Sequence, residues 1–78
     1  MSNLSEKIDW AIRTFNDAVL QRTDRDGNRY ETEEEAIAQN LGLLFYVKEI
    51  YPNHRFPAWA RGQLQVSLEK IEAAGFRF

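Results

Sequence analysis

The chain has 78 residues, of which 44% are hydrophobic and 28% are charged, and its formal net charge is −2. These values are typical of one small globular domain, here residues 1–78, and they exclude a disordered chain. The sequence has no cysteine, which excludes disulfides and thiolate metal sites, and no apolar run approaches the ~20 residues of a membrane span. Because its start also lacks the pattern of a signal peptide, we expect a soluble, cytoplasmic protein with no membrane partner.

The charges are distributed unevenly along the sequence. Residues 1–40 hold nine acidic and five basic side chains, whereas residues 41–78 hold three acidic and five basic ones. Nucleic-acid binding depends on clustered Lys and Arg, and the bases of the second part are spread along it, so a nucleic acid is not the expected partner. An acidic face for a basic partner protein fits better. The five spread bases are Lys48, Arg55, Arg61, Lys70 and Arg77.

The first expected element is a helix that starts at an N-cap, Ser5, and ends near Arg22. Its apolar side chains recur at the spacing of one helical face. Residues 23–31 follow with turn-forming residues and no apolar periodicity. The apolar face comprises Leu4, Ile8, Ala11, Ile12, Phe15, Ala18 and Val19.

A second helix is expected from Thr32 to Tyr51. Thr32 and Glu35 have the spacing of a capping box, and the glutamates between them suit the positive end of the helix dipole. Apolar residues cover about two thirds of the circumference of this helix, which predicts a central position with neighbours on several sides. Pro52 ends the helix.

A third helix is expected from Pro57, a residue suited to a first turn, to about Ala74, with Gly75 as its left-handed C-terminal residue. The sequence therefore predicts an all-α fold, a small three-helix bundle with an acidic loop between the first two helices.

The acidic loop, residues 24–35, has oxygen-bearing side chains at nearly the spacing of a calcium site. It resembles the twelve-residue loop of EF-hand proteins, and the resemblance implies a divalent-cation site. The loop departs from that pattern at Arg29, where the family has glycine, and at Glu31, where it has an apolar residue. The alternative is a polar turn whose glutamates cap the second helix. The implied ligands are Asp24, Asp26, Asn28, Tyr30 (through its carbonyl), Thr32 and Glu35.

Two other classes of function have less support in the sequence. An enzyme is not indicated, because His54 is the single histidine, cysteine is absent and no serine has an evident base beside it; no cofactor is expected. Residues 35–42 resemble the first helix of a helix-turn-helix motif, and residues 68–75 resemble the end of a winged-helix recognition unit. That resemblance implies a DNA-binding regulator, but the apolar run 43–47 follows where the turn belongs.

The remaining signal is an excess of aromatic surface. Trp10 lies opposite the apolar face of the first helix, and the third helix has a second apolar line through Trp59, Gly62 and Val66. The chain then ends Phe76-Arg77-Phe78. These side chains either fold back over the bundle or form an interface, because Trp, Tyr and Arg are the usual interface anchors.

From this surplus we expect a non-catalytic protein–protein interaction domain. Its size and acidity are typical of the small inhibitors or accessory proteins that phages and mobile elements encode. Self-association through the third helix, with Gly62 allowing close approach, is the alternative to a different protein partner. The expected partner-binding residues are Trp10, Trp59, Val66, Phe76 and Phe78, with an acidic rim of Glu31, Glu33 and Glu34.

Overall fold

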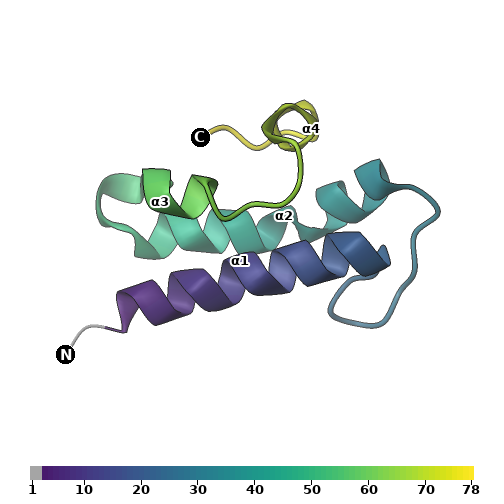
Figure 1. The fold of residues 1–78 in the computed structure, drawn as a ribbon, viewed down its shortest axis with the longest axis horizontal. Coiled ribbons are helices and arrows are strands. Elements are labelled where there is room, and N and C mark those ends of the chain that lie inside the picture. The colour runs from purple at the N-terminus through teal and green to yellow at the C-terminus, as the bar shows by residue number, and fades with distance from the viewer. Residues whose placement is uncertain (1–2) are drawn as a thin grey trace.

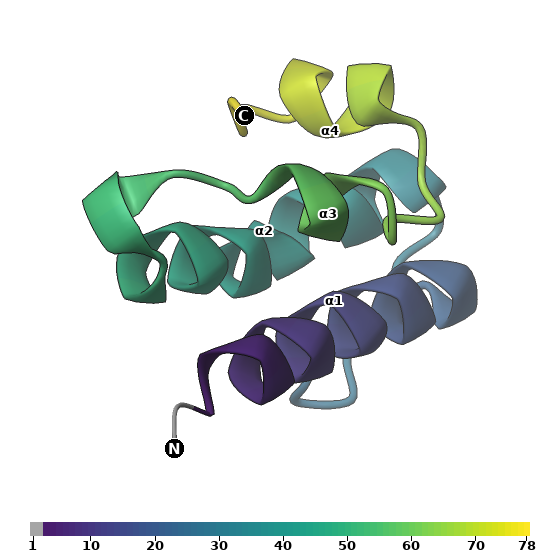
Figure 2. The same ribbon diagram turned by 60° about the vertical axis from the view of Figure 1, so that its left-hand side comes forward.

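The computed structural model describes residues 3–78 and is all-α, with no β-strand in that range. Two helices of 18 residues, α1 (Leu4–Gln21) and α2 (Glu33–Ile50), lie side by side and antiparallel (Figure 1). A 3₁₀ turn, η1 (Pro52–His54), leads to the short helices α3 (Ala58–Arg61) and α4 (Leu68–Ala73). These later elements cover one face of the α1–α2 pair (Figure 2). None of the helices described is both long enough and apolar enough to cross a membrane.

Helix α1 forms where the periodicity predicts it, with small differences at both ends. It begins at Leu4, so Ser5 belongs to its first turn and is not the cap. It ends at Arg22, which takes the left-handed conformation (φ 56°), and Thr23 N then donates to the Ala18 carbonyl (2.9 Å). A non-glycine residue in this conformation costs about 1 kcal/mol, so the tertiary contacts that follow must hold it there.

Helix α2 is the central element, as its broad apolar surface predicts. The Thr32 hydroxyl oxygen accepts a hydrogen bond from Glu35 N (3.1 Å), which confirms the predicted N-terminal cap. The helix packs against α1, η1 and α4. It ends at Tyr51, an extended residue (ψ 139°), because the proline that follows disfavours the helical conformation before it.

The third helix is the element that the sequence predicts wrongly. Residues 62–67 are not helical; they separate α3 from α4, which lies crosswise to α2 (Figures 1 and 2). In this segment Leu64 and Val66 pack against the core, whereas Gln63 and Gln65 are exposed. An alternation with a period of two is typical of extended backbone. Trp59, Gly62 and Val66 therefore do not share one helical face, because the helix is interrupted between α3 and α4.

A side-chain amide on α1 holds this segment in place. Asn16 Nδ2 donates to the Gln63 carbonyl (3.0 Å), and Asn16 Oδ1 accepts from Gln65 N (3.0 Å). One side chain thus satisfies a backbone acceptor and a backbone donor of a segment in which the helical hydrogen bonds end at Leu64. The extended path places Val66 beside the core and sets the start of α4.

The end of the chain folds back onto the bundle. Gly75 adopts φ 116°, as predicted for a residue that ends a helix, and Phe76 N donates to the Ile71 carbonyl (3.3 Å). The Phe76 ring is fully buried, with its centroid 5.1 Å from that of Phe45 and 5.3 Å from that of Phe56. Edge-to-face ring pairs of this kind add stability beyond the area they bury. Phe76 is therefore a core residue.

We expect Asn16→Asp to destabilise the protein by about 1–2 kcal/mol, because the carboxylate keeps the acceptor but loses the donor and faces the Gln63 carbonyl. Urea denaturation measures the loss, and hydrogen exchange at Gln65 N should accelerate. The control Gln39→Glu makes the same chemical change at an exposed position of α2 and should alter stability by less than about 0.5 kcal/mol. Unchanged protection at Gln65 would show that the amide does not hold the segment.

Candidate functional site

The loop after α1 is organised by one carboxylate. Asp24 Oδ1 accepts from Asp26 N and from Asn28 N, both at 2.9 Å. Asp24 Oδ2 accepts from Asn28 Nδ2 (2.9 Å) and from the Tyr30 hydroxyl (2.5 Å). Four donors from the loop itself thus converge on this carboxylate, which leaves it little capacity for another ligand.

These hydrogen bonds shift the acidity of both partners. The pKa of Asp24 falls from 3.8 to about 2, first because the Tyr30 hydroxyl donates to the ionised carboxylate and next because the Asn28 amide does. The same bond favours the neutral phenol and raises the pKa of Tyr30 from 10.0 to about 12. Between these two pKa values the ionised Asp24 carboxylate accepts a hydrogen bond from the neutral Tyr30 hydroxyl, and this bond holds the loop.

The structure does not gather the acidic side chains of the expected calcium loop into a metal site. Among residues 3–78 no group of three or more His, Cys, Asp or Glu side chains is placed to hold a metal ion. The left-handed turn falls at Gly27 (φ 88°), whereas an EF-hand loop would need it at Arg29, which instead forms a bridge with Thr23. The predicted ligands serve the loop and the helix cap instead, or lie exposed; they were Asp24, Asp26, Asn28, Tyr30, Thr32 and Glu35.

The turn that the helix-turn-helix resemblance implies after Gly42 is not formed. Helix α2 continues through Gly42, where the motif requires a turn, and residues 43–47 are part of the same helix.

The predicted acidic rim is partly neutralised within the chain. Lys70 Nζ of α4 lies 2.8 Å from Glu33 Oε1 and 3.9 Å from Glu34 Oε1 at the start of α2. The pKa of Lys70 is raised, chiefly by its hydrogen bond to Glu33. Glu31 is exposed, and its carbonyl accepts from Arg22 Nη1 (2.8 Å). The glutamates at the start of α2 thus help to position α4.

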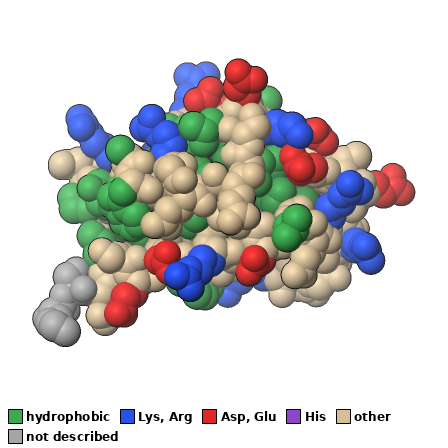
Figure 3. Space-filling model, in the orientation of Figure 1, with side chains coloured by type: hydrophobic (Ala, Val, Ile, Leu, Met, Phe, Trp, Pro, Cys, Tyr) green, Lys and Arg blue, Asp and Glu red, His purple; other side chains and the backbone are tan. Residues whose placement is uncertain are grey.

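The predicted aromatic anchors fall into two groups. Phe76 is fully buried, and Phe78 and Val66 are half-buried against the core, so these three form no exposed patch. Trp10 and Trp59 have 46% and 43% of their surfaces exposed. Of the predicted anchors only the two indoles stay exposed, and Leu20 and Phe45, which were not predicted as anchors, are exposed at least as much. On the side seen in Figure 3, hydrophobic side chains show at the end where α3 lies, and charges of both signs surround them.

Trp10 belongs to a surface that sequence reasoning only partly identified. The Trp10 ring packs edge to face against the ring of Tyr46 on α2, and their centroids are 6.3 Å apart. The Arg25 guanidinium lies 5.4 Å from the centroid of the Trp10 ring. Arg25 also lines a hollow of about 300 Å³ together with Gly42, one turn before Tyr46 on α2. We call these four residues, Trp10, Arg25, Gly42 and Tyr46, the Trp10 face.

Gly42 is another residue of this surface that the sequence analysis did not identify. It lies in the middle of α2, is exposed, and a Cβ built there would meet no atom within 4 Å. Glycine within a helix costs roughly 0.5–1 kcal/mol relative to alanine, and here no contact in the chain requires it. The sequence signal was a glycine inside the most regular helical pattern of the chain.

A buried side-chain amide fixes the position of the loop beside the Trp10 face by hydrogen bonding. The buried Asn40 of α2 donates through Nδ2 to the Thr23 carbonyl (2.9 Å) and to the Ala36 carbonyl (2.8 Å). Its partner Thr23 starts the loop that carries Arg25 over Trp10. The cation on the Trp10 face is therefore placed by a buried hydrogen bond as well as by the Asp24 turn.

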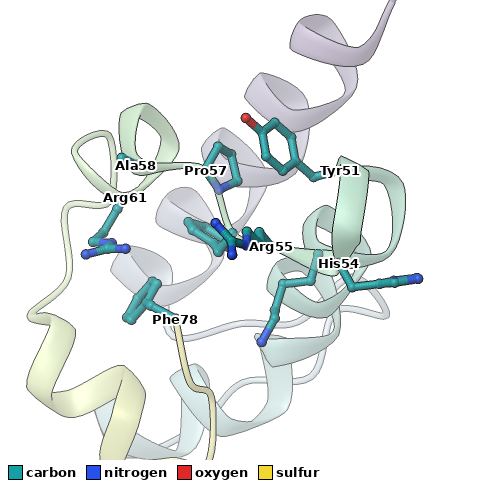
Figure 4. Close-up of a pocket in the computed structure, with 9 residues that line it drawn as sticks. Tyr51, His54, Arg55, Pro57, Ala58, Arg61 and Phe78 are labelled. Carbon is teal, nitrogen blue, oxygen red and sulfur yellow. The ribbon is translucent and has the colours of Figure 1, made fainter.

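A second pocket, of about 450 Å³, opens between the C-terminal end of α2, η1, α3 and the end of the chain (Figure 4). Asn53 and His54 both have positive φ (65° and 52°), which turns the chain sharply so that Arg55 lines the pocket. Two such residues cost of order 1 kcal/mol or more each. Sequence reasoning treated the basic residues here as scattered and so missed the pocket.

Comparison with known proteins adds no functional assignment, because no family model, curated protein or solved structure matches this chain.

The Asp24–Tyr30 pair makes the loop sensitive to pH at both extremes. The lowered pKa of Asp24 stabilises the folded loop fully above its ordinary 3.8, and this contribution disappears as the pH falls toward 2. The raised pKa of Tyr30 means that its hydrogen bond stabilises the loop fully below pH 10, and this contribution is lost as the pH rises through 12. We expect Tyr30→Phe to move the pKa of Asp24 back toward 3.8, as measured by carboxyl NMR titration. An unchanged Asp24 titration would contradict the hydrogen bond, and Tyr46→Phe is the matched control.

Proposed function

We propose that this chain is a non-catalytic domain that binds another protein through the Trp10 face. The observation that carries the proposal is a half-exposed indole held in place by Tyr46 and Arg25 beside a helical glycine with open space above it. Tryptophan, tyrosine and arginine are the residues most enriched among interface anchors.

The energetic argument rests on surface that the chain leaves in water. An indole of ~200 Å² that is about half exposed leaves ~100 Å², and covering it contributes ~2.5 kcal/mol at 25 cal/mol per Å². Because the neighbouring ring and guanidinium already limit the motion of Trp10, a partner loses little side-chain entropy in ordering it.

Gly42 defines how close a partner comes. With no side chain at this position, the backbone of α2 is accessible next to Tyr46 and the hollow beside Arg25. The hollow is lined mainly by polar side chains, so a complementary partner places a hydrogen-bonding side chain in it and covers the Trp10 ring beside it. Such a domain acts by occupying a surface of its partner, as a small inhibitor or accessory protein does.

A different protein, and not a second copy, is the occupant that we propose. The predicted self-association required a continuous third helix with Gly62 on its face, and the helix is interrupted at residues 62–67. The Trp10 face is also smaller than the ~800 Å² per partner typical of a stable interface, so the partner must supply surrounding contacts.

Gly42→Ala separates folding from binding. The methyl group meets nothing within the chain, so the substitution should stabilise the fold by roughly 0.5–1 kcal/mol through helix propensity. Urea denaturation measures this gain. A loss of stability would show that Gly42 serves the fold, and the case for an approach site at this position would fail.

Photo-crosslinking tests the surface directly. A photoreactive residue in place of Tyr46 should capture a discrete protein in the native cell, and one in place of Leu20, which is 80% exposed, should not. The purified partner should then bind the wild-type chain and lose about tenfold or more in affinity with Trp10→Ser. Trp59→Ser, a change at an indole of nearly equal exposure, is the matched control. Equal losses in the two variants, or a crosslink to a second copy of the chain, would overturn the proposal.

A further inference from the structure

The pocket at the C-terminal end of α2 gathers cations that are distant in the sequence. Lys48 comes from α2, Arg55 from the turn after η1 and Arg61 from α3, and all three line it. Figure 4 shows Arg55 and Arg61 entering from different segments near the Phe78 ring. We call Lys48, Arg55, Arg61 and the ring of Phe78 the basic pocket.

No acidic side chain lines the basic pocket to balance its three cations. In the described part of the chain neither Arg55 nor Arg61 belongs to an ion pair. His54 also lines the pocket, and its Nδ1 lies 3.7 Å from Glu49 Oε2. Glu49 itself is not among the residues that line the pocket. An uncompensated set of cations in a chain of net charge −2 attracts an anion by ordinary electrostatics.

Two of the cations are already held in position. The Arg61 guanidinium lies 5.3 Å from the centroid of the Phe78 ring. A stacked guanidinium keeps its N–H donors directed outward in its own plane, the arrangement that suits an oxyanion. Lys48 Nζ donates to the Arg77 carbonyl (2.8 Å) and lies 5.2 Å from the Phe76 ring, which limits the freedom of its side chain.

The pocket also has an aromatic wall. Phe78 is half-buried, with ring centroids 5.2 Å from Phe56 and 5.0 Å from Phe76, and Tyr51 lines the same pocket. Its volume of about 450 Å³ is in the range of small-molecule sites. Cations beside ring carbons suit a ligand with a charged end and a flat apolar end.

We propose that the basic pocket binds a phosphomonoester whose organic part carries an aromatic ring. The phosphate, which carries close to two negative charges at neutral pH, contacts Arg55, Arg61 and Lys48, and the ring lies against Phe78 and Tyr51. The site shares no residue with the Trp10 face, so this inference is independent of the proposed function.

Phenyl phosphate, the simplest such ligand, is the probe. Titration followed by backbone amide NMR should give saturable shifts at residues that line the pocket, with tighter binding than inorganic phosphate. Arg55→Ala and Arg61→Ala should each weaken binding about tenfold, as expected for lost charge-assisted hydrogen bonds. Arg55 forms no ion pair among the described residues, so its removal leaves the fold intact, which the spectrum of the free variant verifies.

Arg29→Ala is the matched control, because it removes the same charge from the loop at the opposite end of α2 (Figure 1). It should change the affinity less than twofold, roughly the screened effect of a remote surface charge. Equal weakening by Arg29→Ala and Arg55→Ala, or shifts centred away from the pocket, would reduce the result to non-specific attraction and overturn the proposal.

Two further ligands distinguish the sources of the same chemistry. Adenosine monophosphate represents a free nucleotide, and phosphotyrosine represents a phosphorylated side chain. Tighter binding of either one than of inorganic phosphate supports the site and identifies its source. If neither of these ligands nor phenyl phosphate binds more tightly than inorganic phosphate, the aromatic wall takes no part and the proposal fails.

Discussion

The hydrogen bonds between the Asn16 amide and residues 63–65 are the contact on which the rest of this arrangement depends. They compensate backbone groups that a continuous helix would have satisfied internally. With that segment extended along α1, α4 starts in a crosswise position and Phe76 reaches the core between α2 and the turn before α3. A straight third helix would carry residues 76–78 away from α2, so the path that Asn16 stabilises, together with the turn at Gly75, brings Phe76 into the core and Phe78 to the basic pocket.

The course of residues 62–67 also brings together charged side chains that are distant in the sequence. Lys70 of α4 approaches the glutamates that begin α2, and Lys48 and Arg61 approach the phenyl rings at the chain end. The Lys70–Glu33 pair is exposed, and exposed ion pairs contribute little to stability. The effect of these contacts is on the surface: acids that the sequence leaves free become paired, whereas bases that lie far apart in the sequence converge without acidic partners.

Two surfaces, the Trp10 face and the basic pocket, are not covered by other parts of the chain, and they differ in chemistry. The Trp10 face is aromatic with one cation, and it lies over the α1–α2 pair beside the loop that Asp24 organises. The basic pocket is formed by the second half of the chain around Phe78. Both are built from positions whose side chains are fixed by neighbours, Trp10 by Tyr46 and Arg61 by Phe78, and such preorganisation favours binding.

The sequence by itself determined the all-α fold, the two long helices, the Thr32 cap and the break at Gly75, because each depends on local periodicity or on the conformational preference of single residues. It also indicated Trp10 as a residue outside the core. The tertiary structure alone decided that residues 62–67 do not continue the helix, because Gln63-Leu64-Gln65-Val66 suits either conformation and the choice depends on Asn16, 47 residues away from Gln63. It likewise decided that Asp24 binds its own loop and that Arg55 and Arg61 meet at one pocket. Hydrogen bonds and charges join residues by their distance in space, and no spacing along the chain encodes that distance before the chain is folded.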